Sequence, residues 1–424
     1  MVARRTASRA PIVVAVLTAA LLALGTAVVP LLPATAAGTG AVDCSAPAWA
    51  EGRSYTAGQH VTHQGAGYTA LVTHTAHPGA GWDPASTPTL WTLDGTCGGT
   101  PDPEPEPEPT DPGGEADTPV AANGQLRVCG TGLCNEQGTR IQLRGMSTHG
   151  TQWYSQCVTD GSLDTLANDW DADVLRISTY VQEGGYETDP ARFTALVNSY
   201  IDELTARGLY AIVDWHMLDP GDPHVNLQRA KTFFTAIAER NNGKNNIIYE
   251  VANEPNGVSW QTIKSYHEQI VPVIRAKDPD AVILLGTRAW SSLGVSDGAN
   301  EFEVVNNPVN ASNVMYTFHF YAASHREEYL SALSRAADRI PVFITEFGTQ
   351  DYAGEGPNDF AMSQRYLDLA ASKKISWVNW NYSDDHRSGA VWTEGTCASG
   401  DFGAHRLKEA GAWIRDRIRT PDAF

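Results

Sequence analysis

The chain has 424 residues, of which 42% are hydrophobic and 9% aromatic, and its 49 acidic and 30 basic residues give a formal net charge of −19. This length and composition are sufficient for more than one packed domain. The negative charge repels the phosphates of nucleic acids, so we expect no nucleic-acid partner, whereas a neutral polymer is a suitable partner.

The N-terminus has the pattern of an export signal. Arginines precede an apolar run over residues 12–29, and Ala34-Thr35-Ala36 supplies small residues for cleavage. We therefore predict that residues 1–36 are a signal peptide and that the protein is secreted, extracellular and without membrane association once the signal is removed. An uncleaved anchor is the alternative, because the run is long enough to span a bilayer. Export makes the six cysteines candidates for disulfides rather than metal ligands.

Two further changes in composition divide the rest of the chain. Residues 43–97 form a small segment rich in aromatic residues, Gly and Thr, with little helical periodicity. Residues 98–120 include alternating Pro and Glu, which favours an extended polyproline II spacer of about 3.1 Å per residue. We expect this Pro/Glu linker to separate a small all-β module from a globular domain over residues 121–424.

The globular region alternates apolar strand-like runs with amphipathic helical stretches. The clearest helix starts with Asp189 as N-cap and Pro190 as first residue, and ends at Gly208. The strand-like runs are 142–146, 174–178, 210–214, 248–253, 282–285, 314–319, 342–346 and 376–380. Eight strands alternating with helices predict an α/β fold, a (β/α)8 TIM barrel. A doubly wound open sheet is the alternative, but the sequence lacks its glycine-rich phosphate loop.

Polar and aromatic residues recur where the strand-like runs end. Active sites of this fold lie at the C-terminal ends of the strands. His, Trp and Tyr are uncommon in exposed loops that have no functional role. Residues of this kind at the strand ends are His149, Arg176, His216, Glu254, Trp290, His319, Tyr321, Glu346 and Trp380. We therefore predict a functional site at the mouth of the barrel.

Glu254 and Glu346 are the two glutamates at strand exits, after the fourth and seventh strands. They can converge across the barrel mouth, as a retaining glycosidase requires of two carboxyl groups about 5–5.5 Å apart. Burial and proximity raise the pKa of the proton donor, whereas cationic and hydroxyl donors keep the nucleophile ionised. Arg176 and Tyr321 are suitable donors to the nucleophile. A structural ion pair is the alternative interpretation of the two glutamates.

Seven sequence motifs follow one another at successive strands of this region. They are Leu143-Arg144-Gly145-Met146-Ser147-Thr148-His149-Gly150, Val174-Leu175-Arg176-Ile177, Asp214-Trp215-His216, Tyr249-Glu250-Val251-Ala252-Asn253-Glu254-Pro255, Tyr316-Thr317-Phe318-His319-Phe320-Tyr321, Phe343-Ile344-Thr345-Glu346-Phe347-Gly348 and Trp377-Val378-Asn379-Trp380. Together they closely resemble the bacterial cellulases of glycoside hydrolase family 5, over essentially all of residues 121–424.

The resemblance implies a retaining endo-β-1,4-glucanase that hydrolyses internal bonds of cellulose by double displacement, with Glu254 as acid/base and Glu346 as nucleophile. It implies that Asn253 donates to the sugar 2-hydroxyl and that Arg176 steadies Glu346 or the strand ends. The other implied substrate contacts are His216, His319, Tyr321, Trp380 as the sugar platform beside the cleavage point, Trp153 with His149 at a more distant subsite, and Trp290 on the leaving-group side. For the histidines and Trp290, ordinary packing is the alternative. A structural salt bridge is the alternative for Arg176, and a plain turn residue is the alternative for Asn253.

One motif departs from the family pattern. After the last strand, relatives carry a Lys and then a Glu that bind a sugar two sites from the cut, and here Asp385 and Arg387 occupy those places. Both residues can still hydrogen-bond hydroxyl groups. We therefore expect Asp385 and Arg387 to face the cleft with their charges exchanged.

The small N-terminal segment is similar to the family 5/12 carbohydrate-binding modules. The matching motifs include Ala48-Trp49, His74-Thr75-Ala76, Gly81-Trp82-Asp83-Pro84 and Pro88-Thr89-Leu90-Trp91. The resemblance implies a compact β fold that binds chitin or cellulose through exposed aromatic residues. We predict Trp82 and Tyr68 as its binding residues and a Cys44–Cys97 disulfide as its staple, because small folds need one.

The other four cysteines are paired by their placement. Cys129 and Cys134 bracket a hairpin-sized span, and Cys157 and Cys397 lie after the first and last strands, which become neighbours when the barrel closes. We predict a disulfide within each pair.

Rival functions come from other classes. A metal-dependent hydrolase of the same fold could use His149, His216, His319 and Asp214, although its usual pair of histidines after the first strand is reduced to one. A binding protein without catalysis is disfavoured by the intact glutamates.

Among glycosidases, mannan, lichenan and chitosan are the alternatives to cellulose as substrate. We expect no metal, no cofactor, a polysaccharide substrate and a monomer.

Overall fold

The computed structural model describes residues 46–77, 80–97 and 118–420, which belong to two compact units divided between Thr110 and Asp111. The predicted signal peptide and linker, and Cys44 of the predicted Cys44–Cys97 disulfide, lie outside the described residues and stay predictions. Among the described residues no helix is both long and apolar enough to cross a membrane.

The N-terminal unit is a small β fold. Strands β2 (His60–His63), β3 (Ala66–Ala70) and β5 (Trp91–Thr96) form one antiparallel sheet, and β1 (Ser54–Tyr55) pairs with β4 (His74–Thr75). Its core is built around Tyr55, Val61, Tyr68 and Trp91.

Tyr68 is therefore wrongly predicted as a binding residue of this unit. Its side chain is 9% exposed and packs in the core of the sheet. Val61 pairs with it across β2 and β3, so an aromatic ring at this position fills the interior. Trp82 is 37% exposed and stays available on the surface.

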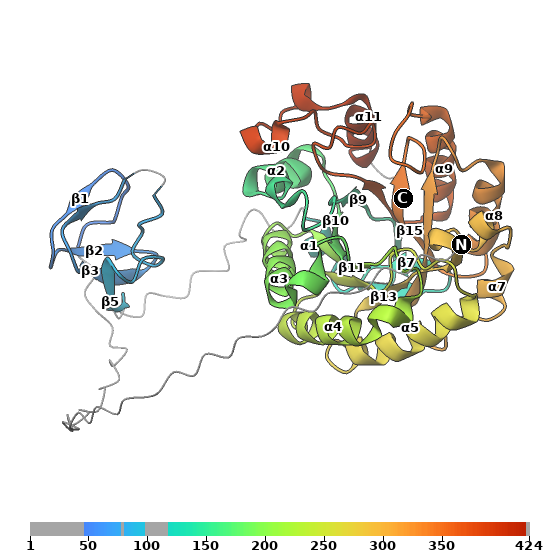
Figure 1. The fold of residues 1–424 in the computed structure, drawn as a ribbon, viewed down its shortest axis with the longest axis horizontal. Helices are drawn as coiled ribbons and strands as arrows, with labels where there is room; N and C mark the ends of the chain where they lie inside the picture. The colour runs from blue at the N-terminus through green and yellow to red at the C-terminus, as the bar shows by residue number, and fades with distance from the viewer. Residues whose placement is uncertain (1–45, 78–79, 98–117, 421–424) are drawn as a thin grey trace, which may run out of the picture. The chain divides into compact units, whose positions relative to one another are not determined.

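The C-terminal unit is a closed barrel of eight parallel strands, as predicted (Figure 1). In order around the barrel the strands are β9 (Arg144–Ser147), β10 (Val174–Tyr180), β11 (Tyr210–His216), β12 (Ile247–Glu250), β13 (Val282–Leu285), β14 (Val314–Tyr321), β15 (Val342–Gly348) and β16 (Trp377–Trp380), and β16 pairs with β9 to close the ring.

Helices surround this barrel (Figure 1). The longer helices are α3 (Pro190–Ala206), α4 (Leu227–Asn241), α5 (Trp260–Arg275), α8 (Glu327–Ala337), α9 (Phe360–Lys373) and α11 (Glu409–Ile418). The shorter ones are α1 (Pro119–Asn123), α2 (Asp160–Asp164), α6 (Arg288–Ser291), α7 (Phe302–Val305) and α10 (Thr396–Ser399). Single turns of other helix types span Ser155–Cys157, Thr165–Asp169, Tyr186–Thr188, Pro223–Asn226, Val295–Asp297 and Ala404–Arg406.

Helix α3 forms for the reasons that the sequence indicates. The Asp189 side chain accepts a hydrogen bond from the N–H of Arg192 at 3.1 Å, and Pro190 is the first helical residue. The apolar face, which includes Phe193 and Ile201, is buried against the barrel. The helix ends before Gly208, whose φ of +65° other residues disfavour.

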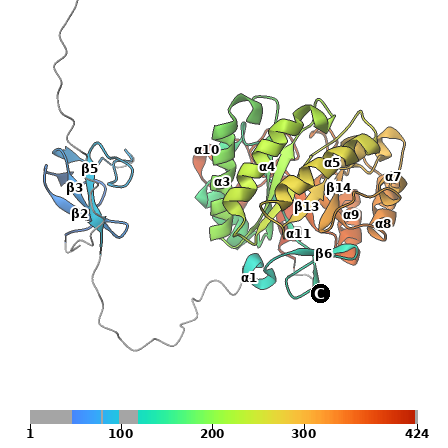
Figure 2. The ribbon, with the colours of Figure 1, turned by 90° about the horizontal axis from the view of Figure 1, so that it is seen from below.

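The lower end of the barrel is closed and apolar. A short antiparallel sheet of β6 (Arg127–Cys129), β7 (Gly132–Cys134) and β8 (Arg140–Ile141) precedes the first barrel strand, and Figure 2 shows α1 and β6 at this end. The predicted Cys129–Cys134 disulfide joins β6 to β7. Leu133 of this sheet and Leu126 just before it pack in one cluster with residues in or next to the barrel strands. The other members of the cluster are Leu143, Val174, Tyr210, Ile212, Ile248, Val282, Leu284, Met315, Phe343 and Val378. A site on the axis of the barrel must therefore lie at the C-terminal ends of the strands.

Candidate active site

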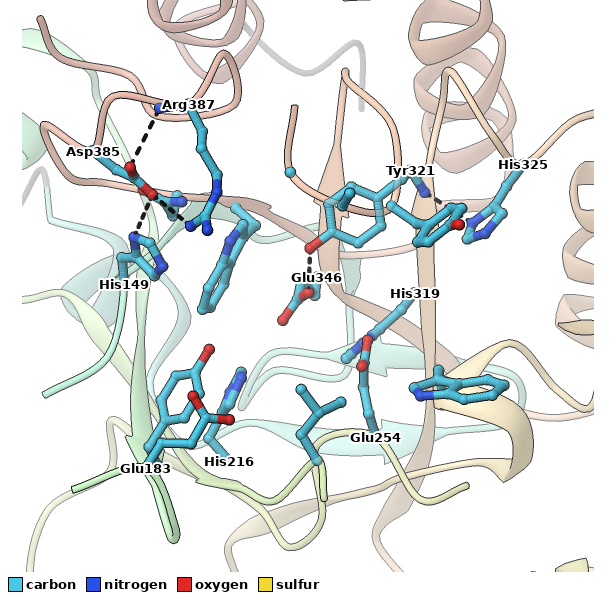
Figure 3. A pocket seen from close by; sticks show the side chains of 18 of the residues that line it. His149, Glu183, His216, Glu254, His319, Tyr321, His325, Glu346, Asp385 and Arg387 are labelled. Atoms are coloured by element: carbon cyan, nitrogen blue, oxygen red, sulfur yellow. Dashed lines mark hydrogen bonds and ion pairs between the residues drawn. The ribbon is translucent and has the colours of Figure 1, made fainter. Parts of the chain in front are cut away.

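A cavity of about 640 Å³ lies at the C-terminal ends of the strands (Figure 3). Loops after most of the strands contribute to it, so residues far apart in the chain meet there. Of the predicted site residues, those that line it are Glu254, Glu346, His149, Trp153, His216, Trp290, His319, Tyr321, Trp380 and Asp385. Arg176 and Asn253 do not.

Glu254 and Glu346 face each other in this cavity (Figure 3). One carboxylate oxygen of each, together with one ring nitrogen of His319, forms a set in which all atoms lie within 4.8 Å. Glu346 lies within β15, whereas Glu254 lies four residues beyond the end of β12. The separation suits two carboxyl groups acting on one glycosidic bond with a covalent intermediate.

Glu346 is held as a carboxylate by two donors. The Arg176 Nη1 atom donates to Oε2 at 3.0 Å, and the Tyr321 hydroxyl donates to Oε1 at 2.6 Å. Burial by itself would raise the pKa of Glu346, but the positive charges of His319 and Arg176 outweigh it and bring the pKa below its usual range. An ionised carboxylate that is aimed into the cavity can attack an electrophilic carbon.

The pKa of Glu254 is shifted in the opposite direction from that of Glu346. Burial raises the pKa of Glu254, and the negative charge of Glu346 adds to this effect, although the His319 hydrogen bond opposes it. His319 Nδ1 lies 2.9 Å from Glu254 Oε1. The two carboxyl groups thus differ in pKa in the directions that an acid and a nucleophile need.

His319 lies between carboxylates and is positively charged. Burial alone would lower its pKa, but its contacts with Glu250 and Glu254 raise the pKa to about 9. Its Nε2 atom lies 2.8 Å from the hydroxyl of Thr345. This cation stabilises the negative charge on both sides of it.

Arg176 contacts Glu346, as its predicted steadying role requires, but it does so from beneath the cavity and not as one of the substrate contacts. It lies in the middle of β10, not at the strand end, and its side chain is fully buried beneath the cavity. It binds Glu250 through Nε at 2.6 Å, Asp214 through Nη2 at 3.0 Å and the side-chain oxygen of Asn253 at 2.7 Å. Arg176 therefore holds the floor of the site and Glu346 instead of the substrate. A buried arginine is tolerated in a protein interior when its charge is paired with carboxylates, as it is here.

Asn253 lies beside Arg176 under the floor and is 1% exposed. Its Nδ2 atom lies 3.3 Å from His216 Nε2 and donates to the Met217 carbonyl at 3.3 Å. Its predicted hydrogen bond to a sugar hydroxyl stays a prediction.

Aromatic rings form the walls of the cavity. Trp153 and Trp290 are 41% and 42% exposed, which favours a binding surface over ordinary packing for both. His216 lies between the rings of Tyr180 and Trp380, with centroid distances of 4.1 and 5.3 Å. Burial and the charge of Arg176 lower the pKa of His216 to about 3, so it is neutral. Such surfaces suit the apolar faces of sugar rings.

Asp385 and Arg387 both line the cavity, as their motif predicts. An Arg387 Nη1 atom lies 3.2 Å from Asp385 Oδ2, and His149 Nδ1 lies 3.4 Å from the same oxygen (Figure 3). Arg387 also approaches Glu355 in the loop after β15, at 3.5 Å. The exchanged charges therefore form an ion-paired wall beside His149.

Several residues of the site were missed from the sequence. Tyr180 and Glu183 line the cavity, and Glu250 is buried beneath it with Arg176. Arg176 and Tyr180 are four residues apart in β10, so they share the inward face of the strand. Because side chains alternate between the two faces of a strand, counting in steps of two from Arg176 would have identified Tyr180 from the sequence. Glu183 lies in a loop and has no such signal.

The metal-dependent alternative receives no support from the arrangement of its proposed ligands. Over the described ranges, the ligand-type side chains that come together in sets of three or more are Glu254, His319 and Glu346, and Cys157, Asp384 and Cys397. The set of His149, His216, His319 and Asp214 is not gathered.

The predicted Cys157–Cys397 disulfide is present, with its Cα atoms 4.7 Å apart. It joins the turn after β9 to α10. The loop that carries His149 and Trp153 is thereby tied to the segment that follows β16.

Comparisons with known proteins agree with the geometry. Residues 134–386 match the family model "Cellulase (glycosyl hydrolase family 5)", and residues 48–92 match the model of carbohydrate-binding module family 5/12. Endoglucanase E-5 of Thermobifida fusca is 60% identical over 312 residues, which are 73% of this chain and 66% of that protein. Endoglucanase CelA of Streptomyces lividans is 56% identical over 346 residues, which are 80% of this chain and 73% of that protein.

Solved structures show the same likeness. The catalytic domain of the Thermobifida fusca endoglucanase superposes with a TM-score of 0.71 at 60% identity, covering 72% of this chain and all of that one. The same domain has also been solved in complex with cellotetraose. This chain thus spans just under two thirds of the full length of endoglucanase E-5.

Proposed function

The chain belongs to glycosyl hydrolase family 5, the cellulase family, and carries a family 5/12 carbohydrate-binding module, and from this membership we propose that it is a secreted endo-β-1,4-glucanase that retains anomeric configuration. The observation that carries the proposal is the pair of Glu254 and Glu346, which face each other across the cavity with pKa values shifted in opposite directions. The names of the two relatives above, both endoglucanases, support a glucan over mannan or chitosan, and the family description, cellulase, supports β-1,4-glucan.

In the first step, the Glu346 carboxylate attacks the anomeric carbon of the sugar. The bond from that carbon to the leaving oxygen breaks, and Glu254 transfers its proton to the leaving oxygen. Burial and the negative charge of Glu346 raise the pKa of Glu254, which favours the protonated form that this step needs. The product of the step is a glycosyl ester of Glu346 and a free chain end.

In the second step, Glu254 acts as a base. It takes a proton from a water molecule, whose oxygen attacks the same carbon and displaces Glu346. Two displacements on one carbon retain its configuration. Arg176 and Tyr321 contact both oxygens of Glu346, so they stabilise the carboxylate as it leaves.

The walls of the cavity supply the binding of a polymer. We assign Trp380 and His149 with Trp153 to sugars on one side of the cut, and Trp290 to the leaving-group side. The module with its exposed Trp82 holds the enzyme on insoluble polysaccharide. Deleting residues 37–112 should then lower activity on insoluble cellulose and leave activity on soluble substrate nearly unchanged.

The test is product analysis on defined substrates. NMR of the first product from a cello-oligosaccharide should show the β-anomer, and an α-anomer would overturn the mechanism. Carboxymethylcellulose, mannan and chitosan compared side by side should show the highest rate on carboxymethylcellulose. Activity should persist after treatment with a chelator, and its loss would favour the metal-dependent class.

A further inference from the structure

Trp290 lies in a run of left-handed backbone at the edge of the cavity. Ala289, Trp290 and Ser291 have φ values of 60°, 56° and 53°, and Leu293 has 57°. This conformation is sterically unfavourable for residues with a Cβ atom, so three in succession must be held by surrounding contacts. The contacts that this turn makes with its neighbours therefore hold it in the strained conformation.

Two of these contacts are hydrogen bonds to the residues on either side of Glu254. The Ser291 hydroxyl donates to the carbonyl oxygen of Asn253 at 2.6 Å. The Trp290 N–H donates to the carbonyl oxygen of Pro255 at 3.1 Å. Glu254 lies beyond the end of β12, so loop contacts of this kind set its orientation.

The Ser291 hydroxyl is buried and fully used. Besides its bond to Asn253, it accepts from the Thr317 hydroxyl at 2.9 Å and from the Thr287 N–H at 3.3 Å. Ser291, Thr287 and Thr317 are each 0% exposed. A hydroxyl has one proton to donate and two lone pairs, and all three are matched here. Through Thr317 it connects the Glu254 loop to strand β14.

We propose that Ser291 is a positioning residue for Glu254 and links its orientation to the turn that presents Trp290. The inference rests on the proposed function, in which Glu254 protonates the leaving oxygen. Ser291 acts through the Asn253 peptide, and a misplacement of the acid by about 1 Å can cost about 100-fold in rate. A sugar that contacts Trp290 is thereby placed on the same rigid unit as the proton donor.

Aryl β-cellobiosides that differ in leaving group test this role. The phenolate of phenyl cellobioside is a poor leaving group and needs a proton on its oxygen from the acid. The 2,4-dinitrophenolate of 2,4-dinitrophenyl cellobioside departs without this proton. Ser291→Ala should lower kcat/KM about 10- to 100-fold on phenyl cellobioside and less than about threefold on the dinitrophenyl compound. In a double-mutant cycle, adding Ser291→Ala to Glu254→Ala should cause no further loss on phenyl cellobioside. Equal losses on both substrates, or additive losses, would overturn the proposal.

Ser292→Ala is the matched control. Ser292 is 1% exposed and belongs to the same turn, but its hydroxyl donates to the Ala289 carbonyl at 2.6 Å. Both substrates should be cleaved at nearly the wild-type rate, and a selective loss equal to that of Ser291→Ala would reject the assignment. Ser291→Cys keeps a donor, although the thiol is larger and a weaker donor than the hydroxyl, so an intermediate selective loss is expected. It carries the test if thermal melting shows that Ser291→Ala is unfolded.

The Glu254→Ala variant separates this inference from the function beneath it. Its kcat/KM, which reports the first step, should fall far more on phenyl cellobioside than on 2,4-dinitrophenyl cellobioside. If it does not, the proposed acid is wrong. If it does and Ser291→Ala has no selective loss, the role of Ser291 alone is wrong.

Discussion

The Nδ1 atom of His319 lies 2.9 Å from Oε1 of Glu254, so a cation contacts the group proposed as the acid. Such a contact by itself lowers the pKa of a carboxyl group, but the burial of Glu254 has the larger effect and raises its pKa. The same cation lowers the pKa of Glu346. His319 therefore sets the pH range in which one glutamate is protonated and the other is not.

Replacing His319 should move the pH profile. Without its positive charge the pKa values of Glu346 and Glu254 both rise, so both the acidic and the alkaline limb of kcat/KM shift to higher pH in His319→Gln. The maximum should also fall, by about 10- to 100-fold, because a stabilising charge is lost. The measurement is kcat/KM on a soluble cello-oligosaccharide across pH.

The control for this experiment is His325→Gln. His325 also lines the cavity, but burial lowers its pKa to about 4, so it carries no charge at neutral pH. Neither limb should move in this variant. A shift of the His319→Gln profile to lower pH would contradict the assigned electrostatics.

The two glutamates should respond differently to an external nucleophile. Glu346→Ala should lose activity about a thousandfold or more, since no covalent intermediate forms. Azide can then replace the carboxylate and give an α-glycosyl azide. In Glu254→Ala, azide instead attacks the intermediate on Glu346 and gives the β-glycosyl azide from an activated substrate. NMR of the two products identifies the roles, and the same anomer from both variants would refute them.

The Asp385–Arg387 pair should govern binding at one end of the cleft. Arg387 is 42% exposed in its side chain and Asp385 is 1% exposed, so Asp385 orders Arg387 at the cavity wall. We expect the Asp385→Ala, Arg387→Ala double variant to raise KM several-fold on long cello-oligosaccharides, with little change on the shortest substrate. Equal changes across chain lengths would show that the pair does not contact the sugar. Steady-state kinetics on a series of chain lengths supplies the measurement.

The module offers a contrast between two aromatic residues. Trp82→Ala should weaken binding to insoluble cellulose without changing the melting temperature, because Trp82 is on the surface. Tyr68→Ala should destabilise the module by about 3–5 kcal/mol, because its ring fills the core. Pull-down on insoluble cellulose and calorimetry distinguish these effects. Unchanged binding by Trp82→Ala would remove this residue from the binding surface.

The amino-acid sequence determined the architecture of this protein through local patterns. Eight apolar runs separated by capped amphipathic helices can bury their faces together in few ways, and the barrel is one of them. The structure places the strands within a few residues of the predicted runs, as at β13, Val282–Leu285. Glu254 and Glu346 were found because each follows or ends such a run.

Tertiary structure decided which side chains reach the cavity. The sequence does not show that Arg176 lies below the floor while Tyr180, four residues later, lines the cavity. Nor does it show that Tyr68 faces the core and Trp82 the surface. The left-handed turn at Trp290 and its bonds to the Glu254 loop likewise join residues from different strands. Periodicity reports only that a residue is inward or outward, whereas depth, pKa and hydrogen-bond partners depend on neighbours contributed by distant segments.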